Sequence, residues 1–264
     1  MVDDRTYKCG KCRDSDGFAL PISMAFQPIV DCDTGMPFAY EALVRGCDGQ
    51  SAAEVLAGVD EETRYTFDQR CRVVAIEQAV RAGLVESGAK LSINFLPGAV
   101  YSPAACIQLT LRTARAVGLP LDRLIFEFTE NEPMLDTGHV ATIVQHYRQM
   151  GFGCAIDDFG AGHSGLNRLA VLHPDYVKLD MELVRGIDND MRRRAIVSGL
   201  VAMCRQLGVT LIAEGIETPG ERDTLRLLGV RYLQGYLFAH PAFEALPPIV
   251  WESGIGGDIA LAAA

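Results

Sequence analysis

Long apolar runs are missing from this chain of 264 residues. No stretch of about 18 or more apolar residues occurs, so the sequence predicts no membrane-spanning helix. The first twelve residues, MVDDRTYKCGKC, also lack the basic and then apolar pattern of a secretory signal. We therefore expect the chain to stay in the cytoplasm.

An excess of positive charge is missing as well. The chain has 24 Lys and Arg residues against 34 Asp and Glu residues, which gives a formal net charge of −10. Such a surface repels a polyanion, so we expect no binding to a nucleic acid polymer. A small phosphorylated ligand remains compatible with this charge, because bound cations can invert the local field.

Most of the common catalytic motifs are absent. There is no Walker motif, HExxH or GxSxG, and the five histidines lack the spacing of a zinc site. The stretch CAIDDFGAGHSGL, residues 154–166, contains the DFG triplet of protein kinases. However, the glycine-rich nucleotide loop, the VAIK strand and the HRD loop of kinases are missing, which excludes a kinase.

The eight cysteines include one CxxC pair, Cys9 and Cys12. This spacing suits a zinc half-site or a redox pair, but the chain has no second CxxC to complete a zinc site. The pair is therefore open to two interpretations, one structural or adventitious and the other a metal or redox site.

Short β-rich runs alternate with longer segments of helical period. The runs cover residues 24–30, 38–44, 90–95, 124–130, 153–159, 175–180, 210–216 and 231–238. Four of the helical segments end at glycine, a helix stop signal, at Gly118, Gly151, Gly208 and Gly229. Only DCDTGMP separates the first two runs, which is too short for a helical crossover, so they should form an antiparallel hairpin turning at Thr34–Gly35.

Eight strands with helical crossovers predict an α/β protein with a TIM-like (β/α)8 barrel and a modified start, and a doubly wound open sheet is the alternative. Residues 1–20 are polar and lack periodicity, so we interpret them as an N-terminal extension. A folded domain should then cover residues 21–250, followed by a flexible tail over residues 251–264.

Polar residues interrupt the apolar strands, mostly near their C-terminal ends. They are Glu41, Asn94, Glu127, Asp157, Asp158, Lys178, Asp180, Glu214 and Gln234. In a barrel these ends meet at one face, where active sites are built. Two unit charges about 4 Å apart repel by about 4 kcal/mol at an effective dielectric of about 20. Five of these carboxylates would converge on one small space and therefore need raised pKa values or bound cations: Glu41, Glu127, Asp157, Asp158 and Glu214. With the amide oxygen of Asn94 they suit Mg²⁺, Mn²⁺ or Ca²⁺.

Asp157 and Asp158 are adjacent, and on a regular strand they would point to opposite faces. Both reach one site only if the backbone departs from regular β geometry, which Gly160, Gly162 and Gly165 permit. Two such carboxylates suit two metal ions a few ångströms apart.

Lys178 and Asp180 share one face of their strand. The lysine could hold a nucleophilic water or balance charge on a phosphoryl oxygen, or form only a salt bridge. Glu214 is a candidate metal ligand or general base, and a local hydrogen bond in the AEGIET turn is the alternative.

EALVRG at residues 41–46 resembles the signature of the EAL-domain phosphodiesterases of cyclic di-GMP. FQPIV, NFLP, EFTE, DDFGAG, VKLD, AEGIET and QGYLFAHP accompany it in the family's order, over residues 22–246. The resemblance implies a barrel whose first strand is antiparallel. It also implies hydrolysis of cyclic di-GMP to linear pGpG with two Mg²⁺ or Mn²⁺ ions, Ca²⁺ being inhibitory or substituting, and a homodimer.

The resemblance also implies roles for individual residues. Metal ligands would be Glu41, Asn94, Glu127, Asp157, Asp158 and Glu214. Lys178 would position the attacking water, and Glu41 and Glu214 would share in catalysis. Substrate contacts would come from Gln27, Leu43, Arg45, Asp180, Glu217 and Gln234, with Arg45 on a phosphate. Glu130 would anchor the loop after the aspartates.

That loop departs from the family's usual DDFGTGYSSL, because Ala161, His163 and Gly165 replace the threonine, the tyrosine and the second serine. The metal ligands are unaffected, so we expect activity, while regulation through the loop is left open. The alternative is a module that binds cyclic di-GMP without cleaving it. A third hypothesis is a redox- or zinc-controlled regulator acting through Cys9 and Cys12.

Overall fold

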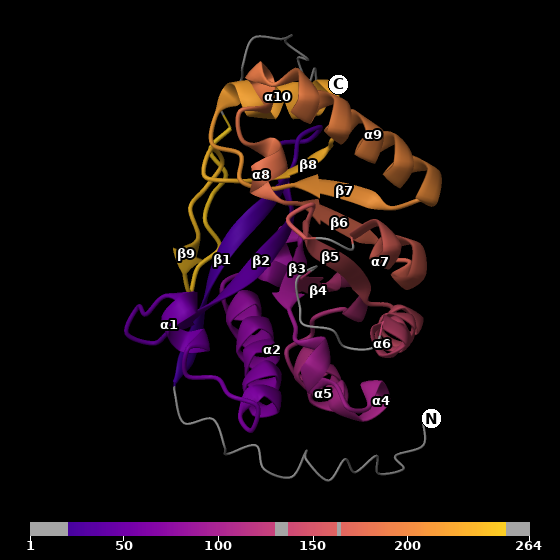
Figure 1. Cartoon of the computed structure of the whole chain (residues 1–264). Coiled ribbons are helices and arrows are strands. Elements are labelled where there is room, and N and C mark those ends of the chain that lie inside the picture. The colour runs from indigo at the N-terminus through magenta and orange to yellow at the C-terminus, as the bar shows by residue number, and fades with distance from the viewer. Residues whose placement is uncertain (1–20, 130–136, 163–164, 252–264) are drawn as a thin grey trace, which may run out of the picture.

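The computed structural model describes residues 21–129, 137–162 and 165–251. Eight strands close into a barrel in the order β2-β3-β4-β5-β6-β7-β8-β1, with β1 also paired to β2 (Figure 1). They are β1 (Ile22–Asp31), β2 (Met36–Gly46), β3 (Lys90–Asn94), β4 (Leu124–Thr129), β5 (Gly153–Phe159), β6 (Tyr176–Leu179), β7 (Thr210–Ala213) and β8 (Tyr232–Gln234). The predicted barrel is confirmed, and the open sheet is excluded.

Strand β1 is antiparallel to both of its barrel neighbours, β2 and β8, whereas all other neighbours in the barrel are parallel. The hairpin turn lies where the sequence predicts it, between Asp31 and Met36, and Gly35 has a φ of 70°. A short strand, β9 (Ala242–Phe243), pairs antiparallel with β1 near Ala25.

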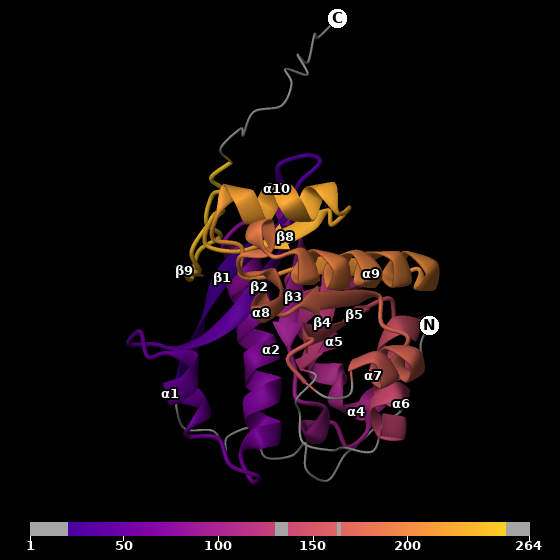
Figure 2. The ribbon, with the colours of Figure 1, turned by 45° about the horizontal axis from the view of Figure 1, so that its top comes forward.

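Helices surround the barrel in both ribbon views (Figures 1 and 2). They are α1 (Ala52–Leu56), α2 (Arg64–Arg81), α3 (Leu84–Ser87), α4 (Pro103–Cys106), α5 (Gln108–Ala116), α6 (Thr137–Gln149), α7 (Gly165–Leu172), α8 (Met181–Val184), α9 (Met191–Leu207) and α10 (Pro219–Leu227). Among the described residues, no helix combines the length and the apolar character needed to cross a membrane.

The helix ends follow local sequence signals. Helix α10 begins with a capping box, in which the Thr218 hydroxyl accepts from the backbone of Glu221 and the Glu221 side chain accepts from the backbone of Thr218. Gly208 ends α9 in the left-handed conformation, with a φ of 70°.

The segment before Gly118 differs from the predicted single helix. It forms two helices, α4 and α5, with the fully buried Ile107 as the C-cap of the first and the N-cap of the second.

The barrel interior has two layers. The first, here called the apolar layer, is a cluster of side chains that are at most 1% exposed: Ile29, Ala39, Ile125, Ala155 and Ile212. The second, here called the ionic layer, lies one inward position further along β2, β4 and β5 at Glu41, Glu127 and Asp157. It also includes Lys178 on β6 and Glu214, which directly follows β7. Side chains two residues apart on a strand share a face, so both layers follow from one alternating pattern.

Candidate metal centre

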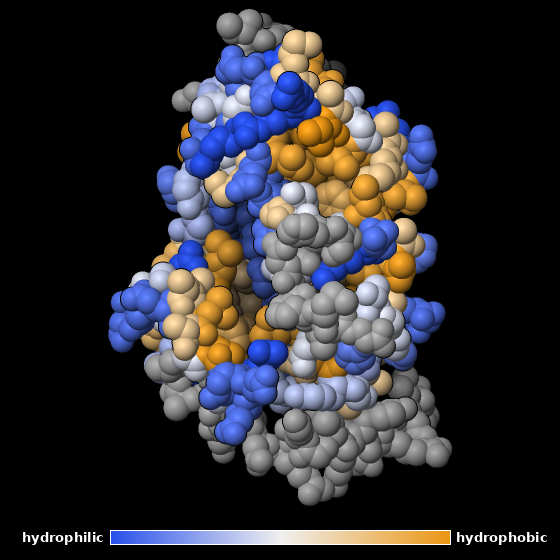
Figure 3. Space-filling model, viewed as in Figure 1, coloured by the Kyte–Doolittle hydropathy of each residue, from blue (hydrophilic) through white to orange (hydrophobic). Residues whose placement is uncertain are grey.

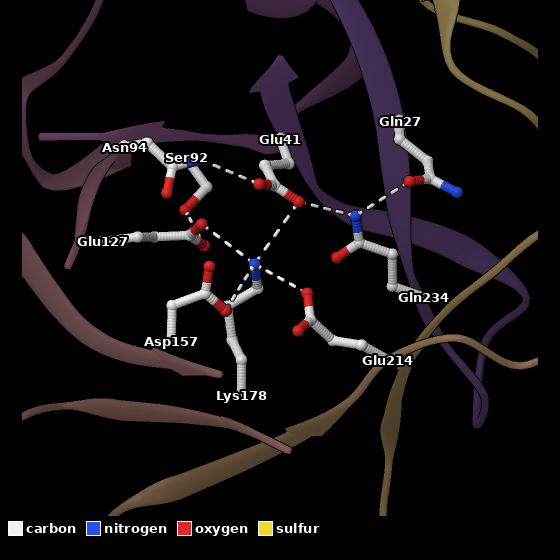
Figure 4. Close-up of polar contacts among 9 residues, drawn as sticks. All are labelled: Gln27, Glu41, Ser92, Asn94, Glu127, Asp157, Lys178, Glu214 and Gln234. Atoms are coloured by element: carbon white, nitrogen blue, oxygen red, sulfur yellow. Dashed lines mark hydrogen bonds and ion pairs between the residues drawn. The ribbon is translucent and has the colours of Figure 1, made fainter. Parts of the chain in front are cut away.

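The ionic layer is arranged around the ammonium group of Lys178 on β6, which is fully buried (Figure 4). Its Nζ lies 2.7 Å from Glu214, 2.9 Å from Glu127, 3.2 Å from Asp157 and 3.3 Å from Glu41. One cation cannot neutralise four carboxylates. The cluster therefore requires added protons or added cations, as the sequence predicts.

The pKa values in the ionic layer are shifted in the way that an excess of buried carboxylates over cations predicts. Burial raises the pKa of Glu127 to about 8 and that of Glu214 well above its ordinary value, although the charge of Lys178 opposes both rises. Burial and the neighbouring Asp157 raise the pKa of Asp158 to about 6. Burial acts to lower the pKa of Lys178, but the surrounding carboxylates outweigh it and raise that pKa well above its ordinary range.

Neutral side chains orient Glu41 and Glu127. Glu41 accepts one hydrogen bond from Asn94 Nδ2 at 2.9 Å and another from Gln234 Nε2 at 2.7 Å. Glu127 accepts from the hydroxyl of Ser92. Ser92 is absent from the predicted site, although it lies two residues before Asn94 on β3 and therefore shares its alternating face.

Asp157 and Asp158 reach the centre through an irregular strand end. The pairing register of β5 with β6 shifts between Ile156 and Phe159, and Asp158 itself has a left-handed φ of 53°. The predicted departure from regular β geometry is therefore confirmed. It begins at the second aspartate and not at the glycines, with Gly160 following at a φ of 102°.

Two groups of carboxylates could each hold a metal ion, and Asp157 belongs to both. Within each group, one oxygen per residue lies within 4.8 Å of the others: Glu41, Glu127 and Asp157 in the first, and Asp157, Asp158 and Glu214 in the second. An all-oxygen donor set fits a hard divalent cation. Asn94 bonds to Glu41 through its nitrogen, so that bond does not use its amide oxygen.

A cavity of about 230 Å³ opens beside this cluster. Its lining comprises Gln27, Glu41, Asp158, Asp180, Met181, Glu214, Gly215, Glu217, Gln234, Gly235 and Tyr236. On the face shown in Figure 3, hydrophilic side chains line a hollow in the middle of the molecule. Tyr236 is absent from the predicted site. Its exposed ring stacks on that of His240, with 4.2 Å between their centroids.

The predicted substrate residues do not all lie in this cavity. Gln27, Asp180, Glu217 and Gln234 line it. Asp180 also caps helix α8, and Glu217 pairs with Arg185 at 2.8 Å. Leu43, in contrast, lines a separate apolar cavity.

Arg45 is among the lining residues of neither cavity, and its Nη1 donates to the carbonyl of Val44 at 2.8 Å. The predicted loop anchor Glu130, the loop residue His163 and the pair Cys9 and Cys12 lie outside the described residues.

Comparisons with known proteins point to one family. The family model described as "EAL domain" matches residues 20–241. The Escherichia coli blue light- and temperature-regulated antirepressor BluF is 31% identical over 247 residues, which cover 92% of this chain and 60% of BluF. The Pseudomonas aeruginosa bifunctional diguanylate cyclase/cyclic di-GMP phosphodiesterase MucR is 38% identical over 226 residues, which cover 82% of this chain and 32% of MucR. The chain thus spans only part of these relatives.

Solved structures agree in fold. A standalone EAL protein from Vibrio cholerae, in its cyclic di-GMP-bound form, is 46% identical, covering 89% of this chain and 98% of its own, at a TM-score of 0.85. Klebsiella pneumoniae BlrP1, in a complex with manganese and cyclic di-GMP, is 36% identical, covering 86% of this chain and 57% of its own, at a TM-score of 0.79.

Proposed function

We propose, from the premise that this chain belongs to the EAL-domain family, that it is a metal-dependent phosphodiesterase hydrolysing cyclic di-GMP to linear pGpG. The observation that carries the proposal is the ionic layer, in which one buried lysine faces four carboxylates beside a cavity of about 230 Å³. Relatives named as cyclic di-GMP phosphodiesterases, and EAL structures that hold this nucleotide, support the choice of substrate.

The two carboxylate groups would hold two divalent ions, Mg²⁺ or Mn²⁺, with Ca²⁺ substituting or inhibiting. The ligands would be Glu41, Asn94, Glu127, Asp157, Asp158 and Glu214. When bound, such ions lower the pKa of water and neutralise charge on phosphoryl oxygens. The manganese complex of BlrP1 supports this choice of ion.

Two residues of the ionic layer are placed to act on the attacking water. Lys178 stays cationic, because the carboxylates around it raise its pKa, so it can donate a hydrogen bond that orients the water. Glu214 lies 2.7 Å from Lys178 Nζ, and in its deprotonated form it can accept the proton released. Water then adds to phosphorus, one phosphorus–oxygen bond of the ring breaks, and the departing oxygen takes up the proton, which gives a linear product with a free hydroxyl and a terminal phosphate.

The cavity would hold the nucleotide. Gln27 and Gln234 would fix its orientation from the β1 and β8 side, where Gln234 Nε2 already donates to Gln27 Oε1 at 3.2 Å. Asp180 and Glu217 also line the cavity, and we expect Leu43 and Arg45 to meet parts of the nucleotide that extend beyond it. Self-association into a dimer, which the family resemblance implies, stays a prediction.

A turnover assay tests the proposal. The purified chain, incubated with cyclic di-GMP and Mg²⁺, should yield pGpG, and Glu41→Ala should abolish the reaction. Unchanged nucleotide after long incubation with both Mg²⁺ and Mn²⁺ would refute it.

The second candidate function is a regulatory module that binds cyclic di-GMP without cleaving it. The similarity to BluF, which is named an antirepressor, favours this alternative. The complete set of candidate metal ligands favours the enzyme. Calorimetry that detects tight binding of cyclic di-GMP, in a sample without turnover, would decide for the module.

A further inference from the structure

A buried ion pair lies on α2, against aromatic side chains of β4 and α6 and against Phe95, which directly follows β3. Asp68 and Arg72 are one helical turn apart, with 2.7 Å between Oδ2 and Nη2, and their side chains are 1% and 0% exposed. Arg72 Nη1 also donates to the hydroxyl of Tyr147 on α6 at 3.0 Å. Burying two charges is costly, and the proposed hydrolysis uses neither group.

The guanidinium of Arg72 packs on two aromatic residues that are direct chain neighbours of candidate metal ligands. Its Cζ lies 5.4 Å from the ring centroid of Phe95 and 5.3 Å from that of Phe126. Phe95 directly follows Asn94, and Phe126 directly precedes Glu127. Because neighbouring strand residues point to opposite faces, the pair supports the metal centre from outside the barrel.

Asp68 holds the chain where it leaves β3. Its Oδ1 accepts a hydrogen bond from the backbone N–H of Leu96 at 2.9 Å, two residues after Asn94. The backbone N–H of Phe95 donates to the carbonyl of Glu127 at 2.9 Å. Asp68, Asn94 and Leu96 line an apolar cavity of about 260 Å³, so this side of the turn faces open space. The hydrogen bonds of Asp68 and Phe95 therefore help to fix its position.

We propose that Asp68 is a positioning residue of the metal centre, and that its bond to Leu96 keeps Asn94 directed toward Glu41. The inference rests on the proposed function, because Asn94 matters here as a metal ligand. Arg72 holds the Asp68 side chain in place through their contact of 2.7 Å. Burial raises the pKa of Asp68, and the charge of Arg72 opposes that rise.

Two double variants isolate this hydrogen bond. Asp68→Asn/Arg72→Met and Asp68→Leu/Arg72→Met both remove the two charges, and replacing a buried ion pair by uncharged residues of similar volume is often tolerated. Only the asparagine variant keeps an oxygen that can accept from Leu96. Asp68→Ala/Arg72→Met also lacks that oxygen, and it replaces the leucine variant if the latter does not fold.

The readout is Mn²⁺ affinity, measured by calorimetry without nucleotide, together with kcat at saturating Mn²⁺. We expect the leucine variant to bind Mn²⁺ about 10-fold more weakly than the asparagine variant, as for other outer-shell substitutions. The two variants should have similar kcat values and, without metal, similar unfolding temperatures. If Asp68 had a merely structural role, kcat and unfolding temperature would instead change together.

Equal Mn²⁺ affinities of the two variants, in a background where the wild-type chain binds Mn²⁺, would overturn the positioning role alone. A wild-type chain that binds no Mn²⁺ would overturn the proposed function, and this inference with it.

Discussion

The apolar and ionic layers of the barrel interior lie one inward position apart on β2, β4 and β5. Ile125 and Glu127 on β4 illustrate the contrast, because both are at most 1% exposed and yet one is a hydrocarbon and the other a carboxylate. At a rise of about 3.3 Å per residue, only about 7 Å separates the two layers. The apolar layer stabilises the fold, and the ionic layer next to it carries the proposed chemistry. Substitutions in the two layers should therefore have different consequences.

The largest effect should come from the ionic layer. Glu127→Gln should lower the rate of cyclic di-GMP hydrolysis at least about 1,000-fold, equivalent to about 4 kcal/mol, because it removes a proposed metal ligand. Unfolding of the metal-free chain should be nearly unaffected, since glutamine has the size of the glutamic acid that a pKa of about 8 keeps protonated near neutral pH. Initial rates and denaturant titration measure the two quantities. A variant that loses stability and activity in proportion would contradict the separation of the layers.

The matched change in the apolar layer is Ile125→Ala on the same strand. It should cost about 3 kcal/mol of unfolding free energy, because it removes buried methyl groups from a packed cluster and leaves a cavity. The folded variant should keep a kcat close to that of the wild type. Denaturant titration measures the loss, and a kcat that falls as far as in Glu127→Gln would show that the layers are not independent.

The next effect in size is the stabilisation of the folded chain by added metal, which should differ between variants of the two layers. Mn²⁺ at about 100 times its dissociation constant should stabilise the chain by about 2.7 kcal/mol, because it binds only the folded ionic layer. For a domain of this size that corresponds to an increase in Tm of about 5 to 10 °C. Ile125→Ala should show the same increase from a lower starting Tm. Glu127→Gln should show a smaller one, and an undiminished shift there would exclude Glu127 as a ligand.

The smallest effect is the change of stability per pH unit, because one titrating group changes it by at most about 1.4 kcal/mol per unit. Burial raises the pKa of Glu127 from 4.5 to about 8, so the folded chain binds a proton between these values that the unfolded chain lacks. The stability of the metal-free chain should therefore fall as pH rises from about 5 to about 8. Mn²⁺ affinity should rise over the same interval, because ligands must be deprotonated. Thermal unfolding at several pH values measures the slope, which Glu127→Gln should reduce and Ile125→Ala should leave unchanged.

Much of this arrangement follows from local sequence patterns. Alternation on strands places Glu41, Glu127 and Glu214 on the inward face, and the short DCDTGMP connection dictates the antiparallel start. These features depend on neighbours in the chain, so the sequence alone predicts the barrel and the residues of the ionic layer.

Other features depend on partners distant in the sequence. Arg72 and Tyr147 are 75 residues apart, and nothing local to α2 indicates that Asp68 reaches the turn after β3. The left-handed backbone at Asp158 depends on how β5 meets β6, and the position of Leu43 in a separate cavity depends on how α1 and α2 pack on β2. Local periodicity carries no information on such contacts.

The most direct test of the account is the fate of cyclic di-GMP in water labelled with heavy oxygen, with Mn²⁺ present, followed by mass spectrometry of the nucleotide. The account predicts linear pGpG carrying one labelled oxygen on its terminal phosphate in the wild type and in Ile125→Ala, and unreacted cyclic nucleotide in Glu41→Ala. Unreacted cyclic nucleotide in the wild type, with Mg²⁺ as well as Mn²⁺, would contradict it.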